Sequence, residues 1–109
     1  MSHHVNAHKA LATTIKISAH NNAIDVYPEW VVLSYCRRDN IKWEGDNLIF
    51  DISFPADKTP FSKARFTKDD PESGDIQFRP GDNAEPKIFK YTVTVNGVGK
   101  LDPGVIIIP

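Results

Sequence analysis

The end of the chain constrains the fold most, because its residues alternate in polarity over one long run. From Phe89 to Val95 every second residue is aromatic or valine, and the residues between them are lysine or threonine. Neighbouring side chains of a β-strand point to opposite faces, so this alternation predicts a strand with one buried face. The segment Asn96–Lys100 breaks the alternation with two glycines, and Val105–Ile108 is wholly apolar. We therefore expect a glycine-rich turn followed by a second strand.

Short runs of the same kind, separated by turn residues, fill most of the remaining chain. Residues 55–87 are less regular, and either a single helical turn over 59–64 or an irregular edge strand over 61–67 fits them. Many short strands with frequent turns predict an all-β fold, a two-sheet antiparallel Greek-key sandwich of about seven to nine short strands. We expect residues 1–11 to form a flexible tail and residues 12–109 a single β-sandwich domain. The remaining predicted strands are Thr14–Ala19, Ala23–Tyr27, Glu29–Tyr35, Ile41–Trp43, Leu48–Phe54 and Ile76–Arg79.

The composition excludes several classes of partner. The chain has 13 basic and 14 acidic side chains, so it has no excess of positive charge to hold a nucleic acid. No apolar run approaches the ~20 residues that span a bilayer, so we expect no membrane partner. The single cysteine excludes an internal disulfide. We expect a cytoplasmic protein, although a leader removed before this sequence begins would leave no trace in it.

Three segments carry a resemblance to a known family. The first is the strand 28–34, which begins at a proline and continues through a polar turn to Ile41-Lys42-Trp43. The second is Phe50-Asp51-Ile52-Ser53-Phe54 before a proline-rich loop, and the third is Phe89-Lys90-Tyr91-Thr92-Val93. Together they resemble the cupredoxin family, the plastocyanin-like β-sandwiches. The resemblance implies a cupredoxin-like topology over residues 12–108.

The resemblance also implies where a type 1 copper ion would be bound, and the ligands expected there are missing. Such a site needs two imidazoles and a thiolate, usually with an axial methionine. The loop Glu44–Asn47 offers no histidine, Val93 matches the thiolate position, and Asn96–Pro103 contains neither histidine nor methionine. The only methionine is Met1. We therefore expect a relative of the cupredoxins without a type 1 copper site and with no cofactor in the domain.

The candidate binding residues lie between positions 30 and 38. Trp30 is out of phase with the apolar residues of its strand, so it would face solvent and serve a protein interface or a sugar, unless both faces of the strand are covered. Cys36 precedes two arginines, which would favour a reactive thiolate; alternatively it is a small, half-buried residue at the margin of a sheet. The candidate binding residues are Trp30, Tyr35, Arg37 and Arg38, and the candidate thiol is Cys36.

Two further segments bear on metal binding. After removal of Met1, the amine of Ser2, two amide nitrogens and the imidazole of His4, with His3 between them, form a square-planar nitrogen set that suits Cu(II) or Ni(II). The alternative is an accidental histidine-bearing tail. The acidic loop 69–75 lacks the spacing of a calcium site, because Pro71 stands where an oxygen ligand is required, and we expect a solvated loop.

These observations favour a non-enzymatic β-sandwich module that acts through an unknown protein partner. No catalytic motif with a nucleophile and its base is recognisable. Because Val105–Ile108 needs cover on both faces, we also expect a homodimer, and the alternative is a monomer whose middle loop covers this strand. A thiol-based redox protein or enzyme using Cys36, and a carbohydrate-binding β-sandwich, are the other functions compatible with the sequence.

Overall fold

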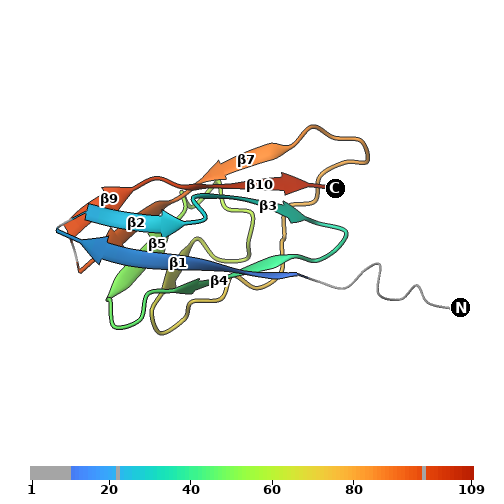
Figure 1. Cartoon of the computed structure of the whole chain (residues 1–109). Coiled ribbons are helices and arrows are strands. Elements are labelled where there is room, and N and C mark those ends of the chain that lie inside the picture. Colours follow the sequence, from blue (N-terminus) through green and yellow to red (C-terminus); the bar gives the residue numbers. More distant parts are fainter. Residues whose placement is uncertain (1–10, 22, 97) are drawn as a thin grey trace, which may run out of the picture.

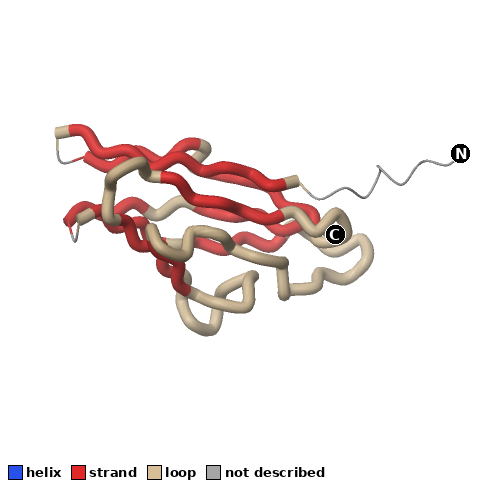
Figure 2. The backbone as a smooth tube through the Cα atoms, turned by 90° about the horizontal axis from the view of Figure 1, so that it is seen from below, coloured by secondary structure: helices blue, strands red, loops and turns tan. Residues whose placement is uncertain are grey.

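The structure is a computed structural model that describes residues 11–21, 23–96 and 98–109. Over these ranges the chain is all-β, as the alternating pattern predicts. The described residues contain strands and loops but no helix, and therefore no helix that could cross a membrane (Figure 2). The predicted tail, residues 1–11, falls outside these ranges except for Leu11.

Ten strands form in the described ranges. The number exceeds the expected count of about seven to nine because the long alternating run is divided at Tyr91, and because an additional strand follows the predicted glycine turn. The strands are β1 (Ala12–His20), β2 (Ala23–Tyr27), β3 (Trp30–Ser34), β4 (Asn40–Glu44), β5 (Phe50–Ser53), β6 (Arg65–Thr67), β7 (Lys87–Lys90), β8 (Thr92–Val95), β9 (Val98–Leu101) and β10 (Gly104–Ile108).

The strands form three small sheets with the orders β2-β1-β4, β3-β10-β7 and β6-β5-β8-β9 (Figure 1). Five of the pairings are antiparallel, but β1 pairs with β4 and β3 pairs with β10 in parallel. The expectation of an antiparallel arrangement throughout is therefore wrong. Polarity alternation identifies the buried face of a strand but carries no information about the direction of its neighbour. Two parallel strands must be joined by a crossover of about a dozen residues or more, and the chain between the strands of both pairs is at least that long.

One hydrophobic core is formed by the inward-facing residues of all three sheets. At its centre the Trp43 ring packs on Phe66 with centroids 5.0 Å apart, and its indole N–H donates to the Tyr91 hydroxyl over 3.4 Å. Trp43 and Tyr91 are both 1% exposed, so both are core residues. Burying a large aromatic side chain contributes roughly 2–3 kcal/mol, so this cluster stabilises the junction of the sheets.

The segment between β5 and β7 agrees with its predictions only in part. No helical turn forms over 59–64, and the alternative of an edge strand over 61–67 is confirmed for β6 (Arg65–Thr67), which pairs with β5 at the edge of its sheet. The predicted strand Ile76–Arg79 does not form either: Ile76 makes one isolated bridge to Phe61. Both of these side chains are buried, so the apolar residues of this segment cover the core from a loop.

Candidate functional site

The alternation in β3 has the phase that the sequence predicts. Val31 and Leu33 point into the core and are 6% and 0% exposed, whereas Trp30 and Val32 are 44% and 54% exposed on the opposite side. Trp30 therefore faces outward. The alternative that both faces of β3 are covered is therefore wrong for a single copy of the described residues.

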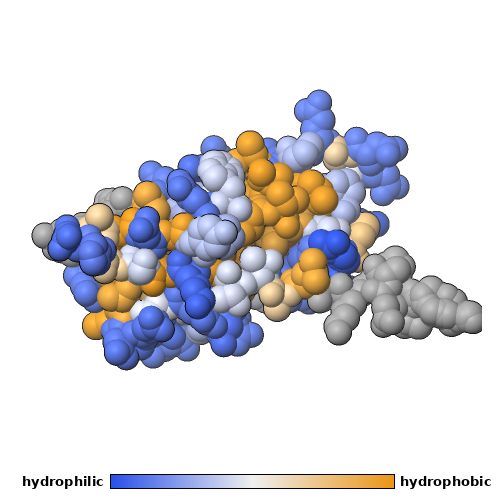
Figure 3. All heavy atoms as spheres, in the orientation of Figure 1, coloured by the Kyte–Doolittle hydropathy of each residue, from blue (hydrophilic) through white to orange (hydrophobic). Residues whose placement is uncertain are grey.

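The outward residues of β3 continue as an apolar row across the sheet. In the strand register, Ile106 of β10 lies between Val32 of β3 and Ile88 of β7. Ile88 is 56% exposed, and Ile106 is partly exposed. Figure 3 shows hydrophobic side chains gathered over these three strands. We call Trp30, Val32, Ile88 and Ile106 the apolar face; patches of a few hundred Å² on a soluble protein often mark an interaction site.

The Trp30 ring has a defined place on this face. Gly104 lies between Trp30 and Lys90 in the register, and a Cβ atom at Gly104 would overlap the Trp30 ring. The glycine therefore allows the indole to lie against β10. On its other side, Nζ of Lys90 is 4.7 Å from the centroid of the Trp30 ring, within the range of a cation–π interaction.

The turn that follows β3 is built around one buried carboxylate. Asp39 is 1% exposed, and it accepts hydrogen bonds from the backbone N–H of Leu11 over 3.0 Å and of Ser34 over 2.9 Å. The Arg37 guanidinium donates to both of its oxygens, over 3.2 and 2.9 Å. The Ser34 hydroxyl donates in turn to the Pro109 carbonyl over 2.8 Å. Asp39 thus joins the turn to the start of β1 and, through Ser34, to the end of β10.

The electrostatics of this turn assign Arg37 a structural part. Burial acts to raise the pKa of Asp39, but the hydrogen bonds from Arg37, Ser34 and Leu11 and the charge of Arg37 outweigh it, so the pKa lies below its ordinary value. The hydrogen bond with Asp39, and then its charge, raise the pKa of Arg37. The Arg37 guanidinium is therefore engaged with Asp39, and Arg37 as a binding residue stays a prediction.

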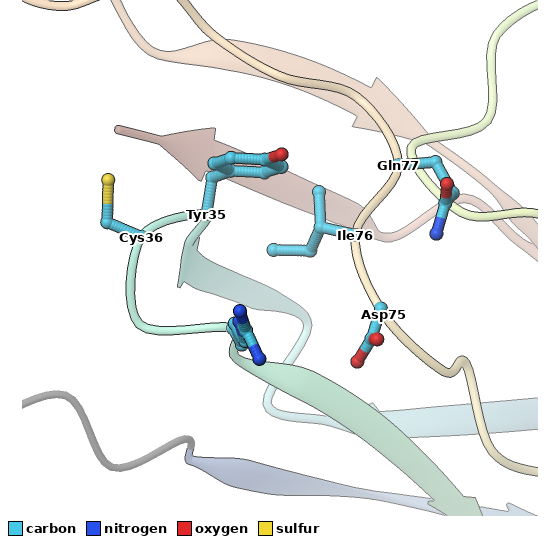
Figure 4. A pocket seen from close by; sticks show the side chains of 6 residues that line it. Tyr35, Cys36, Asp75, Ile76 and Gln77 are labelled. Carbon is cyan, nitrogen blue, oxygen red and sulfur yellow. The ribbon is translucent and has the colours of Figure 1, made fainter.

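The other candidate residues of this turn line a cleft of about 570 Å³. Cys36 is an exposed thiol and not half-buried. Figure 4 shows Tyr35 and Ile76 next to each other, with Cys36 on one side of them and Gln77 on the other. The lining residues are Tyr35, Cys36, Arg38, Asp75, Ile76 and Gln77.

Of the two segments that the cupredoxin resemblance assigns to a copper site, the second begins at Asn96, which bonds to Ile49, two residues beyond the first segment Glu44–Asn47. The Ile49 N–H donates to Oδ1 of Asn96 over 3.2 Å, and the Asn96 N–H donates to the Ile49 carbonyl over 2.7 Å. Val93, at the thiolate position, is 0% exposed and pairs with Ile52 in the neighbouring strand. Where the resemblance would place copper ligands, this chain therefore has the amide of Asn96 and the apolar side chain of Val93.

The structure bears on the other metal predictions only in part. Within residues 11–21, 23–96 and 98–109, no three histidine, cysteine, aspartate or glutamate side chains gather where they could hold a metal ion. The acidic loop is anchored by Ser73, whose hydroxyl accepts from the Ile41 N–H over 2.8 Å. The predicted Cu(II) or Ni(II) ligands Ser2, His3 and His4 lie outside the described residues, so that site stays a prediction.

Sequence reasoning missed several residues of these two regions. Ile88 precedes the alternating run in the phase of Lys90, so its outward position could have been read from the pattern. Asp39 resembles any polar turn residue in the sequence, and nothing there signals that it is buried. Asp75 and Gln77 reach the cleft from a loop almost forty residues away in the sequence, a proximity that no local pattern encodes.

A comparison of the chain with protein-family models, with curated proteins and with solved structures gives no match. The two regions are therefore interpreted from their own geometry.

Proposed function

We propose that this chain is a non-enzymatic binding module with a cupredoxin-like, two-sheet Greek-key sandwich and no type 1 copper site, and that it binds a second copy of itself through the apolar face. The observation that carries the proposal is the row Val32, Ile106 and Ile88, which crosses a whole sheet on its solvent side.

The two-sheet arrangement is supported by the way strands pass from one small sheet to the next. β7 and β8 are separated by Tyr91 alone, and their partners β10 and β9 by residues 102–103. The Tyr91 N–H donates to the Pro103 carbonyl over 3.1 Å at this interruption. In this proposal a single bent hairpin joins the sheets β3-β10-β7 and β6-β5-β8-β9 into one layer, and β2-β1-β4 forms the second layer.

Self-association is supported by the symmetry of the apolar face. A twofold axis that runs along β10 between two copies would place Ile106 on Ile106 and exchange the two outer strands. Val32 of each copy would then meet Ile88 of the other, and Trp30 of each copy would meet Lys90 of the other. Apolar residues meet apolar residues and an aromatic ring meets a cation, so the face is complementary to itself.

The size of the face predicts a weak dimer. About half of each of its larger side chains is exposed, which leaves on the order of 300 Å² of apolar area on each copy. Burying both copies would contribute about 15 kcal/mol at 25 cal/mol per Å², against an association cost of about 4–15 kcal/mol. We therefore expect dissociation in the micromolar range.

Sedimentation velocity over a range of micromolar concentrations tests this proposal. The native chain should shift from monomer to dimer with rising concentration, and Val32→Asp should remove the shift, because the charge would be buried unpaired. Ile49→Asp is the matched control, since Ile49 is 68% exposed but lies outside the apolar face. A native protein that sediments only as a monomer, or a Val32→Asp variant that dimerises like the control, would refute self-association.

The competing thiol chemistry rests on Cys36, which is exposed beside the cleft. A redox or catalytic thiol should react with iodoacetamide near neutral pH much faster than a free thiol of ordinary pKa. Rapid alkylation that is lost in Cys36→Ser would favour this function over the binding module. Alkylation at the rate of a simple thiol would exclude it.

A further inference from the structure

The cleft beside the β3 turn is distinct from the apolar face, and its chemistry is different. It is formed where the turn after β3 meets the loop 75–77, and its volume of about 570 Å³ is in the range of small-molecule sites. Tyr35 and Ile76 supply its apolar surface; Ile76 is 5% exposed, and Tyr35 packs partly against the core. The charged lining residues are Arg38 and Asp75.

These two charges are not satisfied by each other. Among the ion pairs of the described residues, Arg37 pairs with Asp39, but Arg38 and Asp75 have no partner within 4.0 Å. Adjacent arginines of one turn are thus used differently: one is bonded to the buried Asp39, and the other borders the cleft. A cation and an anion that border one cleft, neither with an ion-pair partner among the described residues, are complementary to a ligand that carries both charges.

The frame that carries these side chains is fixed by backbone hydrogen bonds. The Arg38 N–H donates to the Tyr35 carbonyl over 3.0 Å, and Arg38 holds a left-handed backbone with φ of 60°. That conformation is unfavourable for a residue with a Cβ atom, and here the Asp39 network closes the turn around it. On the other wall, the Gln77 N–H donates to the Pro60 carbonyl over 2.7 Å. Both walls are therefore set before any ligand arrives, which lowers the entropic cost of binding.

We infer that this cleft binds a small zwitterion, an α-amino acid with an apolar side chain. The Arg38 guanidinium receives the ligand carboxylate, Asp75 receives the ammonium group, and the apolar body lies against Tyr35 and Ile76.

The test is a titration of the uniformly ¹⁵N-labelled full chain with L-leucine, followed in amide spectra. Saturable shifts of residues 35–38 and 75–77 are expected. Leucinamide, which lacks the carboxylate, and N-acetylleucine, which lacks the ammonium group, should each bind about tenfold or more weakly. Maltose serves as a neutral polyol that tests whether the cleft is instead a carbohydrate site.

Charge-removing variants test the assignment of the two groups. Arg38→Gln and Asp75→Asn should each weaken leucine binding by about 10- to 100-fold, because each removes one charge-assisted hydrogen bond. Arg79→Gln and Asp82→Asn are matched controls, since both residues are exposed and neither lines the cleft. The amide spectra of the variants also show whether each one is folded.

The inference is overturned if leucinamide and N-acetylleucine both bind as tightly as leucine, and also by any of three further results. Leucine could produce no saturable shift at tens of millimolar, maltose could shift the same amides as strongly, or both charge-removing variants could bind like their controls. The two ligand analogues are compared on the native chain, so the test stays decisive if a variant fails to fold. None of these results depends on dimerisation, because the apolar face shares no residue with the cleft.

Discussion

Asp39 is the residue whose replacement should reveal most about how the candidate cleft is held. Its buried carboxylate accepts four hydrogen bonds, from two backbone amides and from two nitrogens of Arg37. In Asp39→Asn one oxygen becomes an NH₂ group, so a donor replaces an acceptor at one side of this cluster. The side chain keeps its shape, and the change is therefore one of hydrogen bonding and charge.

The expected cost follows from the groups left without a partner. A buried N–H that loses its acceptor costs about 1–3 kcal/mol, and the remaining bonds lose the strength that the negative charge gave them. The Arg37 side chain is 43% exposed, so water replaces part of what it loses, and the full 3–5 kcal/mol of a broken buried ion pair is not reached. We expect the free energy of unfolding to fall by about 2–4 kcal/mol.

Urea unfolding monitored by tryptophan fluorescence measures this difference. Because the pKa of Asp39 is lowered in the folded state, its contribution is present above the ordinary carboxyl pKa and is lost as the pH falls through the folded value. The native chain should therefore lose more stability below about pH 4 than Asp39→Asn does. Asp75→Asn, at an exposed carboxylate, is the control and should stay within about 0.5 kcal/mol of the native chain.

A loss of less than about 1 kcal/mol at neutral pH would refute the reasoning. An equal loss of unfolding free energy at acid pH in the native chain and in Asp39→Asn would also refute it. Either result would mean that the four hydrogen bonds do not hold the turn, and the rigid frame assigned to the cleft would lose its basis.

Other predictions concern the core, the apolar face and the tail. Burial raises the pKa of Tyr91 to about 12. The native chain should therefore lose about 2–3 kcal/mol of stability between pH 10 and 12, whereas Tyr91→Phe should not. Equal losses of stability in the two proteins, measured by urea unfolding over this pH range, would contradict this. Gly104→Ala should displace the Trp30 ring, shifting its fluorescence to the red and weakening dimerisation in sedimentation, whereas an unchanged emission spectrum would count against the ring position. In a visible Cu(II) titration, the intense thiolate-to-copper band of a blue site should be absent, and His4→Ala should abolish the weak d–d band of tail-bound copper; persistence of that band would place the metal elsewhere.

The orientation of single strands could be predicted from the sequence because a period of two leaves only two choices. In β3, Val31 and Leu33 cannot both be buried unless Trp30 and Val32 face away, and the structure has this phase. Ile41 and Trp43 of β4 are likewise both buried, two positions apart. The prediction holds because each of these strands has one clearly apolar side.

Which strands pair with each other could not be predicted from the sequence, because the local alternation of polarity carries no information about distant segments. The parallel pairing of β1 with β4 and of β3 with β10 depends on which strands meet after the chain has crossed the core. The alternating run is likewise divided at Tyr91 because its first part, β7, pairs in one sheet and its second part, β8, pairs in another. Asp39 bonds to Leu11 across 28 positions, and only the folded chain shows that this carboxylate is buried.

The two proposed sites differ in the force that would stabilise them, and this makes them separable in one protein. The apolar face would associate through removal of apolar area from water, which salts such as sulfate strengthen. The cleft would bind through Arg38 and Asp75, both exposed, whose attraction for a ligand falls as ionic strength rises. Raising sodium sulfate should therefore favour the dimer while it weakens leucine binding. If both equilibria moved in the same direction, the separate origins assigned to the two sites would be wrong.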